Sequence, residues 1–247
     1  MNNKQNRLAV LIDADNAQPS VIEGLLGEIA SHGVASVKRI YGDWTTNQLS
    51  GWKSVLLEHG IQPIQQFSYT KGKNSTDSAM IIDAMDLLYT KNFDGFCIVT
   101  SDSDFTRLAA RIREDGLFVF GFGEKKTPQA FMSACDKFVY TENLRVETNE
   151  DIPPKRIKLK DINKDKKVLR MMQGVVEDVA DLSGWSYLAT VGNIIGNKLP
   201  DFDPRNYGYR QLTELMRSTN LFEFKDDEIT KQKSMFVRLK RDKKIRK

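Results

Sequence analysis

The sequence predicts an α/β domain followed by a smaller α+β domain, and three observations support this prediction. Between residues 7 and 138, short apolar runs alternate with helical patterns, which is typical of a mostly parallel sheet flanked by helices. Around residues 145–167 the alternation breaks in a highly charged stretch with two adjacent prolines, which is typical of a linker. Three helical patterns and two strand-like runs follow. We therefore expect a first domain at 1–145, a charged linker at 146–166 and a second domain at 167–242.

Each element of the first domain has its own local signal. The predicted strands are apolar runs at 7–13, 34–42, 61–69, 95–101 and 117–123. The predicted helices carry apolar residues at helical spacing at 20–33, 48–60, 75–91 and 104–116, and the stretch 128–138 closes the set. Because Pro63 has no backbone N–H to donate, we expect the third strand to lie at an edge or to start irregularly.

The second domain has a different order of elements. Helical patterns at 168–185, 187–199 and 209–218 precede two strand-like runs at 221–227 and 234–241. Three helices followed by a two-stranded hairpin form the outline of a winged helix, a fold class often used on nucleic acids. We therefore expect a winged-helix-like α+β domain.

The bulk properties exclude several classes of protein. No apolar run in the 247 residues approaches the ~20 that a membrane span needs, and the N-terminus does not read as a secretory signal peptide. The two cysteines, Cys97 and Cys135, provide no disulfide framework, so we expect them to be reduced and structural. These features predict a cytoplasmic protein with no membrane partner.

The charge is distributed unevenly along the chain. Residues 1–145 carry 15 Lys and Arg against 17 Asp and Glu, whereas residues 146–247 carry 22 against 16, so the net charges are −2 and +6. This asymmetry favours a chemical site in the first domain and contact with a polyanion in the second. A solvated lysine-rich surface is the alternative.

Acidic side chains follow the predicted strands directly. Asp13 ends the first strand, Asp102 and Asp104 follow the fourth, and Asp77 stands in the first turn of the helix at 75–91. In an open parallel sheet, ligands bind at the edge where the carboxyl ends of the strands meet. Each acid alone is more often a helix cap or a solvated loop residue, but acids from three separate segments point to one site.

Such a group of carboxylates favours a divalent cation. Two charges ~4 Å apart repel by ~4 kcal/mol at an effective dielectric constant of about 20, and either protonation or a hard cation offsets the repulsion. Mg²⁺ and Mn²⁺ prefer oxygen ligands and support phosphodiester hydrolysis. We therefore expect Mg²⁺ or Mn²⁺ as the cofactor.

Other chemistries have less support. His32 and His59 each precede a glycine at a predicted helix end, where histidine and glycine close helices, so neither is expected to be catalytic or to bind zinc. The stretch LIDADNA at 11–17 resembles the start of the haloacid-dehalogenase-type phosphatases, but Ala17 stands where they have Thr or Val. Asn16 can orient a water or a phosphate oxygen through its amide.

Three spaced motifs of the first domain resemble the NYN branch of the PIN-like nucleases over residues 7–144. These motifs are LIDADN at 11–16, GKNSTDSAMIIDAMDLLY at 72–89 and IVTSDSDFTRLAARIREDG at 98–116. YGDW at 41–44 and ACDKF at 134–138 are also found in bacterial members. The resemblance implies a PIN-like fold and a metal-dependent ribonuclease.

The resemblance also implies roles for individual residues. Asp13, Asp77 and Asp102 correspond to the metal-binding acids, and Asp104 completes the set directly or through water. Asp83 matches a further motif acid, but it lies out of helical phase with Asp77, so we expect it to support the metal ligands and not to bind the metal itself. We expect the same supporting role for Ser101, which directly precedes Asp102. Thr100 stands where the family frequently has Ser.

The second domain resembles the LOTUS domain, also called OST-HTH, through residues 184–216. Members bind RNA or protein partners, and fusions of NYN and LOTUS domains occur. Trp185, Tyr207 and Tyr209 are candidates for stacking on bases, and the alternative is that they are core or turn residues. In the first domain, Lys71, Lys73 and Arg107 are the candidates for contact with RNA phosphates, and a solvated loop and helix face are the alternative.

The resulting hypothesis is a metal-dependent ribonuclease whose second domain binds the RNA. A non-catalytic RNA-binding adaptor that keeps the acidic pocket is the main alternative, and a phosphatase is the third. A protein partner for the second domain also remains open.

Overall fold

The computed structural model describes residues 5–45, 47–67, 75–144, 159–226 and 235–240. The chain divides into two compact units, Met1–Pro154 and Lys155–Lys247, and each is described by itself. The boundaries predicted at residues 145 and 166 stay a prediction. No helix in the described part of the chain is long and apolar enough to cross a membrane.

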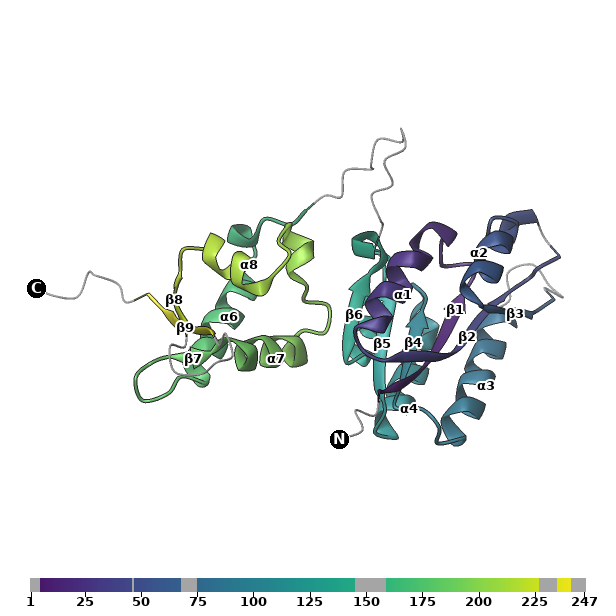
Figure 1. Ribbon diagram of the computed structural model, residues 1–247, viewed down its shortest axis with the longest axis horizontal. Coiled ribbons are helices and arrows are strands. Elements are labelled where there is room, and N and C mark those ends of the chain that lie inside the picture. Colours follow the sequence, from purple (N-terminus) through teal and green to yellow (C-terminus); the bar gives the residue numbers. More distant parts are fainter. Residues whose placement is uncertain (1–4, 46, 68–74, 145–158, 227–234, 241–247) are drawn as a thin grey trace, which may run out of the picture. The chain divides into compact units, whose positions relative to one another are not determined.

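The first domain is built on a six-stranded sheet in the order β3-β2-β1-β4-β5-β6, and every neighbouring pair is parallel (Figure 1). The strands are β1 (Arg7–Asp13), β2 (Val34–Gly42), β3 (Gln62–Gln65), β4 (Gly95–Val99), β5 (Phe118–Gly123) and β6 (Lys137–Tyr140). The predicted fold class, a parallel sheet flanked by helices with a smaller α+β domain after it, is confirmed. The edge position of β3 agrees with Pro63 in that strand.

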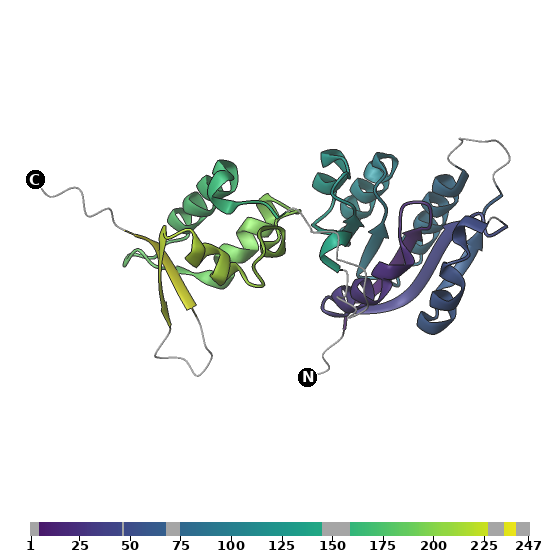
Figure 2. The same ribbon diagram turned by 90° about the horizontal axis from the view of Figure 1, so that it is seen from above.

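Helices cover both faces of this sheet (Figure 2). The helices are α1 (Ile22–Ala30), α2 (Trp52–His59), α3 (Ser75–Tyr89), α4 (Thr106–Glu114) and α5 (Gln129–Ala134), with short 3-10 helices η1 (Pro19–Val21), η2 (Asn47–Leu49), η3 (Ser103–Phe105) and η4 (Thr141–Leu144). Leu8, Val10 and Ile12 of β1 pack with α1 and α2, whereas Ala9 and Leu11 pack with α3, α4 and α5. Burial on both faces explains why β1 is apolar at nearly every position.

The chain reverses its direction across the sheet between β1 and β4. From β1 it proceeds outward to β2 and β3, and it then returns to place β4 on the other side of β1. The register pairs Ile12 with Val99, so the two strands end side by side. The carboxyl ends of β1 and β4 therefore form the topological switch point, where open α/β sheets bind their ligands.

The second domain has its own core of three helices and a small antiparallel sheet. Its elements are η5 (Ile162–Lys164), α6 (Lys166–Asp178), β7 (Ser186–Tyr187), α7 (Leu188–Lys198), η6 (Pro204–Tyr207), α8 (Leu212–Ser218), β8 (Phe222–Asp226) and β9 (Met235–Leu239). The strand order is β7-β9-β8. Met172, Val191, Leu215 and Val237, one from each main element, are fully buried together.

Some elements differ from the pattern that the sequence predicted. Strands β6 and β7 were not predicted, and both are short. The helix expected at 168–185 ends at Asp178. The chain turns after it because the Asp181 carboxylate accepts hydrogen bonds from the backbone of Ser183 (2.8 Å) and Trp185 (3.0 Å), and Gly184 adopts a φ of 79° that suits glycine.

Candidate functional site

Asp13 is buried at the end of β1 and is held by three donors. Its Oδ1 accepts a hydrogen bond from the Asp15 backbone N–H (3.0 Å), and its Oδ2 accepts bonds from the Asn16 amide (2.7 Å) and the Thr100 hydroxyl (3.0 Å). Burial raises the pKa of Asp13, and the bonds from Asn16 and Thr100 oppose that rise. The donors are neutral groups, so they orient the carboxylate without cancelling its charge.

The loop after β4 places two further acids. Asp102 is the N-cap of η3, and its Oδ1 accepts a hydrogen bond from the Asp104 backbone N–H (2.9 Å). The Asp102 backbone N–H donates to the Thr100 hydroxyl (3.2 Å), and the buried Ser101 hydroxyl accepts from the Glu124 backbone N–H (2.9 Å). One acid therefore caps the helix and the second stands exposed in its first turn.

Helix α3 brings a third carboxylate from a separate segment. Asp77 lies in the first turn of α3, and one carboxylate oxygen from each of Asp77, Asp102 and Asp104 can be chosen so that all three lie within 4.8 Å of one another. Burial, and after it the negative charges of Asp13, Asp102, Asp104 and Asp15 in that order, together raise the pKa of Asp77 to about 6. The structure thus gathers acids from β1, α3 and the loop after β4.

The donor set fits a hard divalent cation. All the converging ligand atoms are carboxylate oxygens, which Mg²⁺ and Mn²⁺ prefer over the nitrogen and sulfur ligands typical of zinc. Asp13 is not one of the three acids whose oxygens converge, but it lies close enough for its charge to raise the pKa of Asp77. Its assignment as a ligand stays a prediction.

The hydroxyl of Thr100 has a role that was not predicted from the sequence. It donates to Asp13 and accepts from the backbone of Asp102, so it connects the ends of β1 and β4. Thr100 is fully buried, and its neighbourhood is crowded because a Cβ on Gly123 would lie 2.5 Å from its carbonyl oxygen. The sequence hints at this role, because Thr100 is a polar residue that directly follows an apolar run.

Asp83 lies on α3 and faces strand β2. Its two oxygens accept hydrogen bonds from the Arg39 guanidinium and the Tyr41 hydroxyl. Burial raises the pKa of Tyr41, and the bond to Asp83 raises it further, so the phenol stays protonated as a donor. These two contacts hold α3 against the sheet, and they therefore help to position Asp77, which lies on the same helix.

The residues predicted to contact RNA are scattered. Arg107 is exposed on α4, and Lys71 and Lys73 lie outside the described residues. Tyr207 is buried in the second core with its hydroxyl donating to Asp165 (2.9 Å), and Tyr209 packs against the same core half-buried. Trp185 is half-buried next to β7. The structure thus brings the four predicted acids to one edge but does not gather the aromatic candidates.

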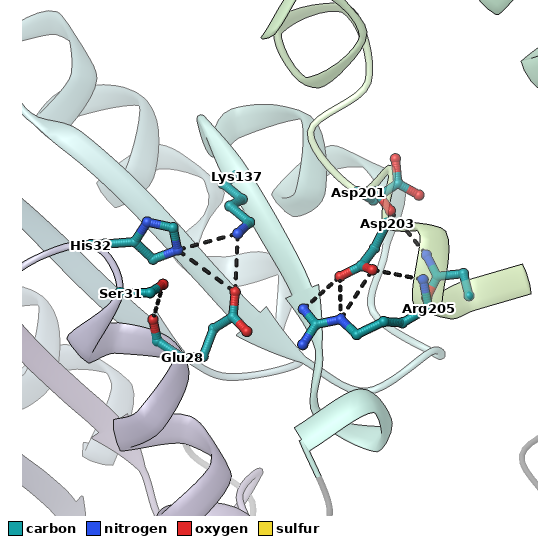
Figure 3. A network of polar contacts seen from close by, with 8 residues as sticks. Glu28, Ser31, His32, Lys137, Asp201, Asp203 and Arg205 are labelled. Atoms are coloured by element: carbon teal, nitrogen blue, oxygen red, sulfur yellow. Dashed lines mark hydrogen bonds and ion pairs between the residues drawn. The ribbon is translucent and has the colours of Figure 1, made fainter. Parts of the chain in front are cut away.

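The first domain has a second charged cluster at the other end of its sheet. Lys137 donates a hydrogen bond to Glu28 (3.0 Å), and its Nζ lies 3.2 Å from Nε2 of His32. The side chains of Glu28, His32 and Lys137 point toward one another (Figure 3), and the His32 ring stacks on Phe120. His32 precedes β2 and Lys137 begins β6, so this cluster lies at the amino end of the sheet. In the second domain, Arg205 donates hydrogen bonds from its Nε (2.9 Å) and Nη2 (2.6 Å) to Oδ2 of Asp203 (Figure 3).

Comparisons with solved structures show partial likenesses. A protein of unknown function from Vibrio parahaemolyticus, VPA0982, is 18% identical, with 57% of this chain and 95% of that chain covered and a TM-score of 0.48. An uncharacterized protein from the NE0665 locus of Nitrosomonas europaea is 25% identical, with 39% and 94% covered and a TM-score of 0.30. The WlbA dehydrogenase from Bordetella pertussis is 15% identical, with 72% and 41% covered and a TM-score of 0.32. No curated protein matches the chain.

Family profiles cover most of the chain. The NYN domain matches residues 7–144, which include the whole parallel sheet and all the acids of the site. The OST-HTH/LOTUS domain matches residues 163–234, which include α6 to β8. The first match points to a nuclease-type hydrolase and the second to RNA binding. The chain therefore belongs to the NYN domain family and carries an OST-HTH/LOTUS domain after the NYN domain.

Proposed function

We propose that this protein is a metal-dependent ribonuclease whose NYN domain cleaves RNA phosphodiester bonds and whose LOTUS domain binds the RNA. The observation that carries the proposal is the convergence of Asp77, Asp102 and Asp104 from two separate segments at the switch point of the sheet. Mutually repelling carboxylates are costly unless a ligand uses them, and a divalent cation is the ligand that their oxygens fit.

The carboxylates of the cluster have distinct roles in this proposal. Asp77, Asp102 and Asp104 would hold Mg²⁺ or Mn²⁺. When bound, such an ion activates a water and shields the charge that develops on the phosphate oxygens. Asp13, oriented by Asn16 and Thr100, adds negative charge beside the cluster and serves as a further ligand or as the group that orients the attacking water.

The proposed roles of Asn16 and Asp83 follow from their contacts. The Asn16 amide donates to Asp13, so we assign it to holding that carboxylate, in place of the direct contact to water or phosphate that the sequence suggested. Asp83 is engaged with Arg39 and Tyr41, so it positions α3 and does not reach the substrate. Arg107, exposed on α4 after η3, remains a candidate for contact with the RNA backbone.

A cleavage assay with Asp102→Asn tests the proposal. Asn caps a helix as well as Asp does, so the variant should keep η3 and the fold while it loses one anionic oxygen. We expect wild-type protein to cleave single-stranded RNA with Mg²⁺ or Mn²⁺ and not with EDTA, and Asp102→Asn to be inactive. Asp86→Asn, an exposed substitution of the same kind on α3, is the matched control.

The possible outcomes separate the candidate functions. RNA binding without cleavage by the wild-type protein under any divalent metal would favour the adaptor. Turnover of a small phosphate ester without RNA cleavage would favour a phosphatase. A folded Asp102→Asn protein with wild-type activity would remove the metal site from the mechanism.

A further inference from the structure

The outer face of the small sheet in the second domain gathers aromatic and cationic side chains. Side chains alternate along β9, so Phe236 and Arg238 point away from the core into which Val237 is buried. Tyr187 of β7 and Lys225 of β8 both stand opposite Phe236. Trp185, Tyr187, Lys225, Phe236 and Arg238 are called the aromatic–cationic face below.

Close contacts fix the geometry of this face. The Lys225 Nζ lies 4.7 Å from the centre of the Trp185 ring and 5.2 Å from that of Phe236, and the Arg238 Cζ lies 4.4 Å from the Trp185 ring. The Tyr187 and Phe236 rings lie 5.8 Å apart. Cations over aromatic rings hold both partners in place, and each such contact contributes about 0.5–1 kcal/mol at an exposed site.

The two cations differ in their remaining partners. Glu223 accepts a hydrogen bond from the Arg238 Nε (2.8 Å) and forms an ion pair with its Nη2 (2.6 Å), so the charge of Arg238 is matched within the sheet. The Lys225 head group lies over two rings, its side chain is exposed, and its charge also helps to lower the pKa of Asp181. Arg238 therefore fixes the Trp185 ring, whereas Lys225 presents a positive charge at an aromatic surface.

The exposure of Tyr187 makes the face accessible. Its side chain is 43% exposed, although a large aromatic side chain on a sheet gains by being covered. By contrast, Tyr207 is only 8% exposed and its hydroxyl is used inside the domain. The aromatic surface that a ligand can reach therefore lies on the sheet and not at the turn before α8.

The charge of the domain complements a polyanion. Residues 155–247 hold 22 Lys and Arg against 13 Asp and Glu. The chain beyond Leu239, where β9 ends, continues through residues 240–247 with six basic residues and one acid. An exposed ring beside an ammonium group suits an unstacked base next to a phosphate, which only single-stranded nucleic acid offers, since a duplex hides its base faces.

We propose that the aromatic–cationic face is the RNA-binding surface of the second domain, with Tyr187 stacking on a base of single-stranded RNA and Lys225 contacting a phosphate. This inference deepens the proposed function and rests on it for the identity of the ligand. In this proposal the aromatic residues of the surface are Trp185, Tyr187 and Phe236. Tyr207 and Tyr209, which the sequence suggested, are not part of it.

Binding of a fluorescein-labelled oligouridine single strand to the full-length protein in EDTA tests this proposal. EDTA prevents metal-dependent cleavage, so the result is independent of whether the first domain is a nuclease. We expect Tyr187→Ala to lower the affinity for the oligonucleotide by roughly fivefold or more, since base stacking contributes ~1–3 kcal/mol per base. Tyr187→Trp should restore binding, and Phe118→Ala, which removes a 58% exposed aromatic at the start of β5, should have no effect.

A salt series separates stacking from phosphate contact. Lys225→Ala should reduce the slope of log K against log salt by roughly 0.7, whereas Tyr187→Ala should lower the affinity and keep the slope. Lys167→Ala, an equal loss of charge at an exposed position of α6, should keep both. Wild-type affinity and slope in both face variants would overturn the proposal. Failure of the wild-type protein to bind RNA would also overturn it and would favour a protein partner for this domain.

Discussion

The two ends of the sheet in the first domain handle their acids differently. At the amino end, Glu28 is paired with Lys137 (3.0 Å) and Asp136 with Arg113 (2.9 Å). At the carboxyl end, Asp13 is held by neutral donors, and Asp77, Asp102 and Asp104 face one another. Paired acids contribute modestly to stability, whereas clustered acids oppose it. The comparison indicates that the carboxyl end is kept for binding and the amino end for folding.

The largest expected effect comes from removing one clustered acid. Asp77→Asn should lower metal-dependent RNA cleavage by roughly 100-fold or more, because changes even in the partners of metal ligands cost 10–100-fold. The thermal stability of the metal-free protein should stay the same or rise, since one of several repelling charges is gone. Cleavage rates and melting curves measured together check both halves of this prediction.

The control for this prediction lies on the same helix. Asp86→Asn changes an exposed acid of α3 by the same atoms and should alter neither cleavage nor melting. If Asp77→Asn is folded and cleaves as well as Asp86→Asn, the contrast between the two ends of the sheet has no functional meaning.

The second prediction tests the connection between the two strands that carry acids. Thr100→Val keeps the shape of the side chain but removes the hydroxyl that contacts Asp13 and the backbone of Asp102. We expect a roughly tenfold loss of cleavage, because the two carboxylates lose their shared support. Thr100→Ser should retain most of the activity. Equal activity in the Val and Ser variants would show that the hydroxyl does not position the acids.

The strand-end acids could be predicted from the sequence, but their supports could not. Asp13 ends one apolar run, and Asp102 and Asp104 follow another within a few residues. Because parallel strands end at one edge, the position of these acids at that edge follows from the fold class. The bridge made by Thr100 depends on the register that sets Ile12 beside Val99, which no local pattern specifies. The partners of Asp83 likewise come from β2, more than 40 positions away along the chain.

The second domain shows the same limit for aromatic residues. A tyrosine that stacks on RNA and one that fills a core have the same sequence signal. Tyr207 is buried because its hydroxyl reaches Asp165, the N-cap of α6, across 42 positions of sequence. Tyr187 is exposed because it lies on the outer face of β7, a strand too short to be recognised from alternation.

The third prediction concerns the amino end of the sheet. Asp136 accepts hydrogen bonds from the Val119 backbone N–H (2.9 Å) and from Arg113 (2.9 Å), so it ties the start of β5 to α4. Asp136→Asn should lower the free energy of unfolding by about 1 kcal/mol through the loss of the charge-assisted bond, with cleavage per folded molecule unchanged. Urea titration and the RNA assay measure the two quantities. A loss of cleavage without a loss of stability would contradict the division between the two ends.

The smallest expected effect is a dependence of stability on pH that originates at the carboxyl end. Burial and the neighbouring acids raise the pKa of Asp77 from 3.8 to about 6, so the folded protein keeps a proton that the unfolded chain has lost between these values. The free energy of unfolding contributed by Asp77 is therefore fully present below pH 3.8, falls as the pH rises to about 6 and stays low above it. Solvent screening of this half-buried side chain should hold the change below about 1 kcal/mol. Urea titrations in EDTA across this pH range should show a steeper fall in the free energy of unfolding for the wild-type protein than for Asp77→Asn. Addition of Mg²⁺ should raise the stability of the wild-type protein mainly above about pH 6, where the Asp77 carboxylate is charged. Identical pH profiles for the two proteins would mean that Asp77 does not share the field of the other acids, and the distinction between clustered and paired carboxylates would then rest on geometry alone.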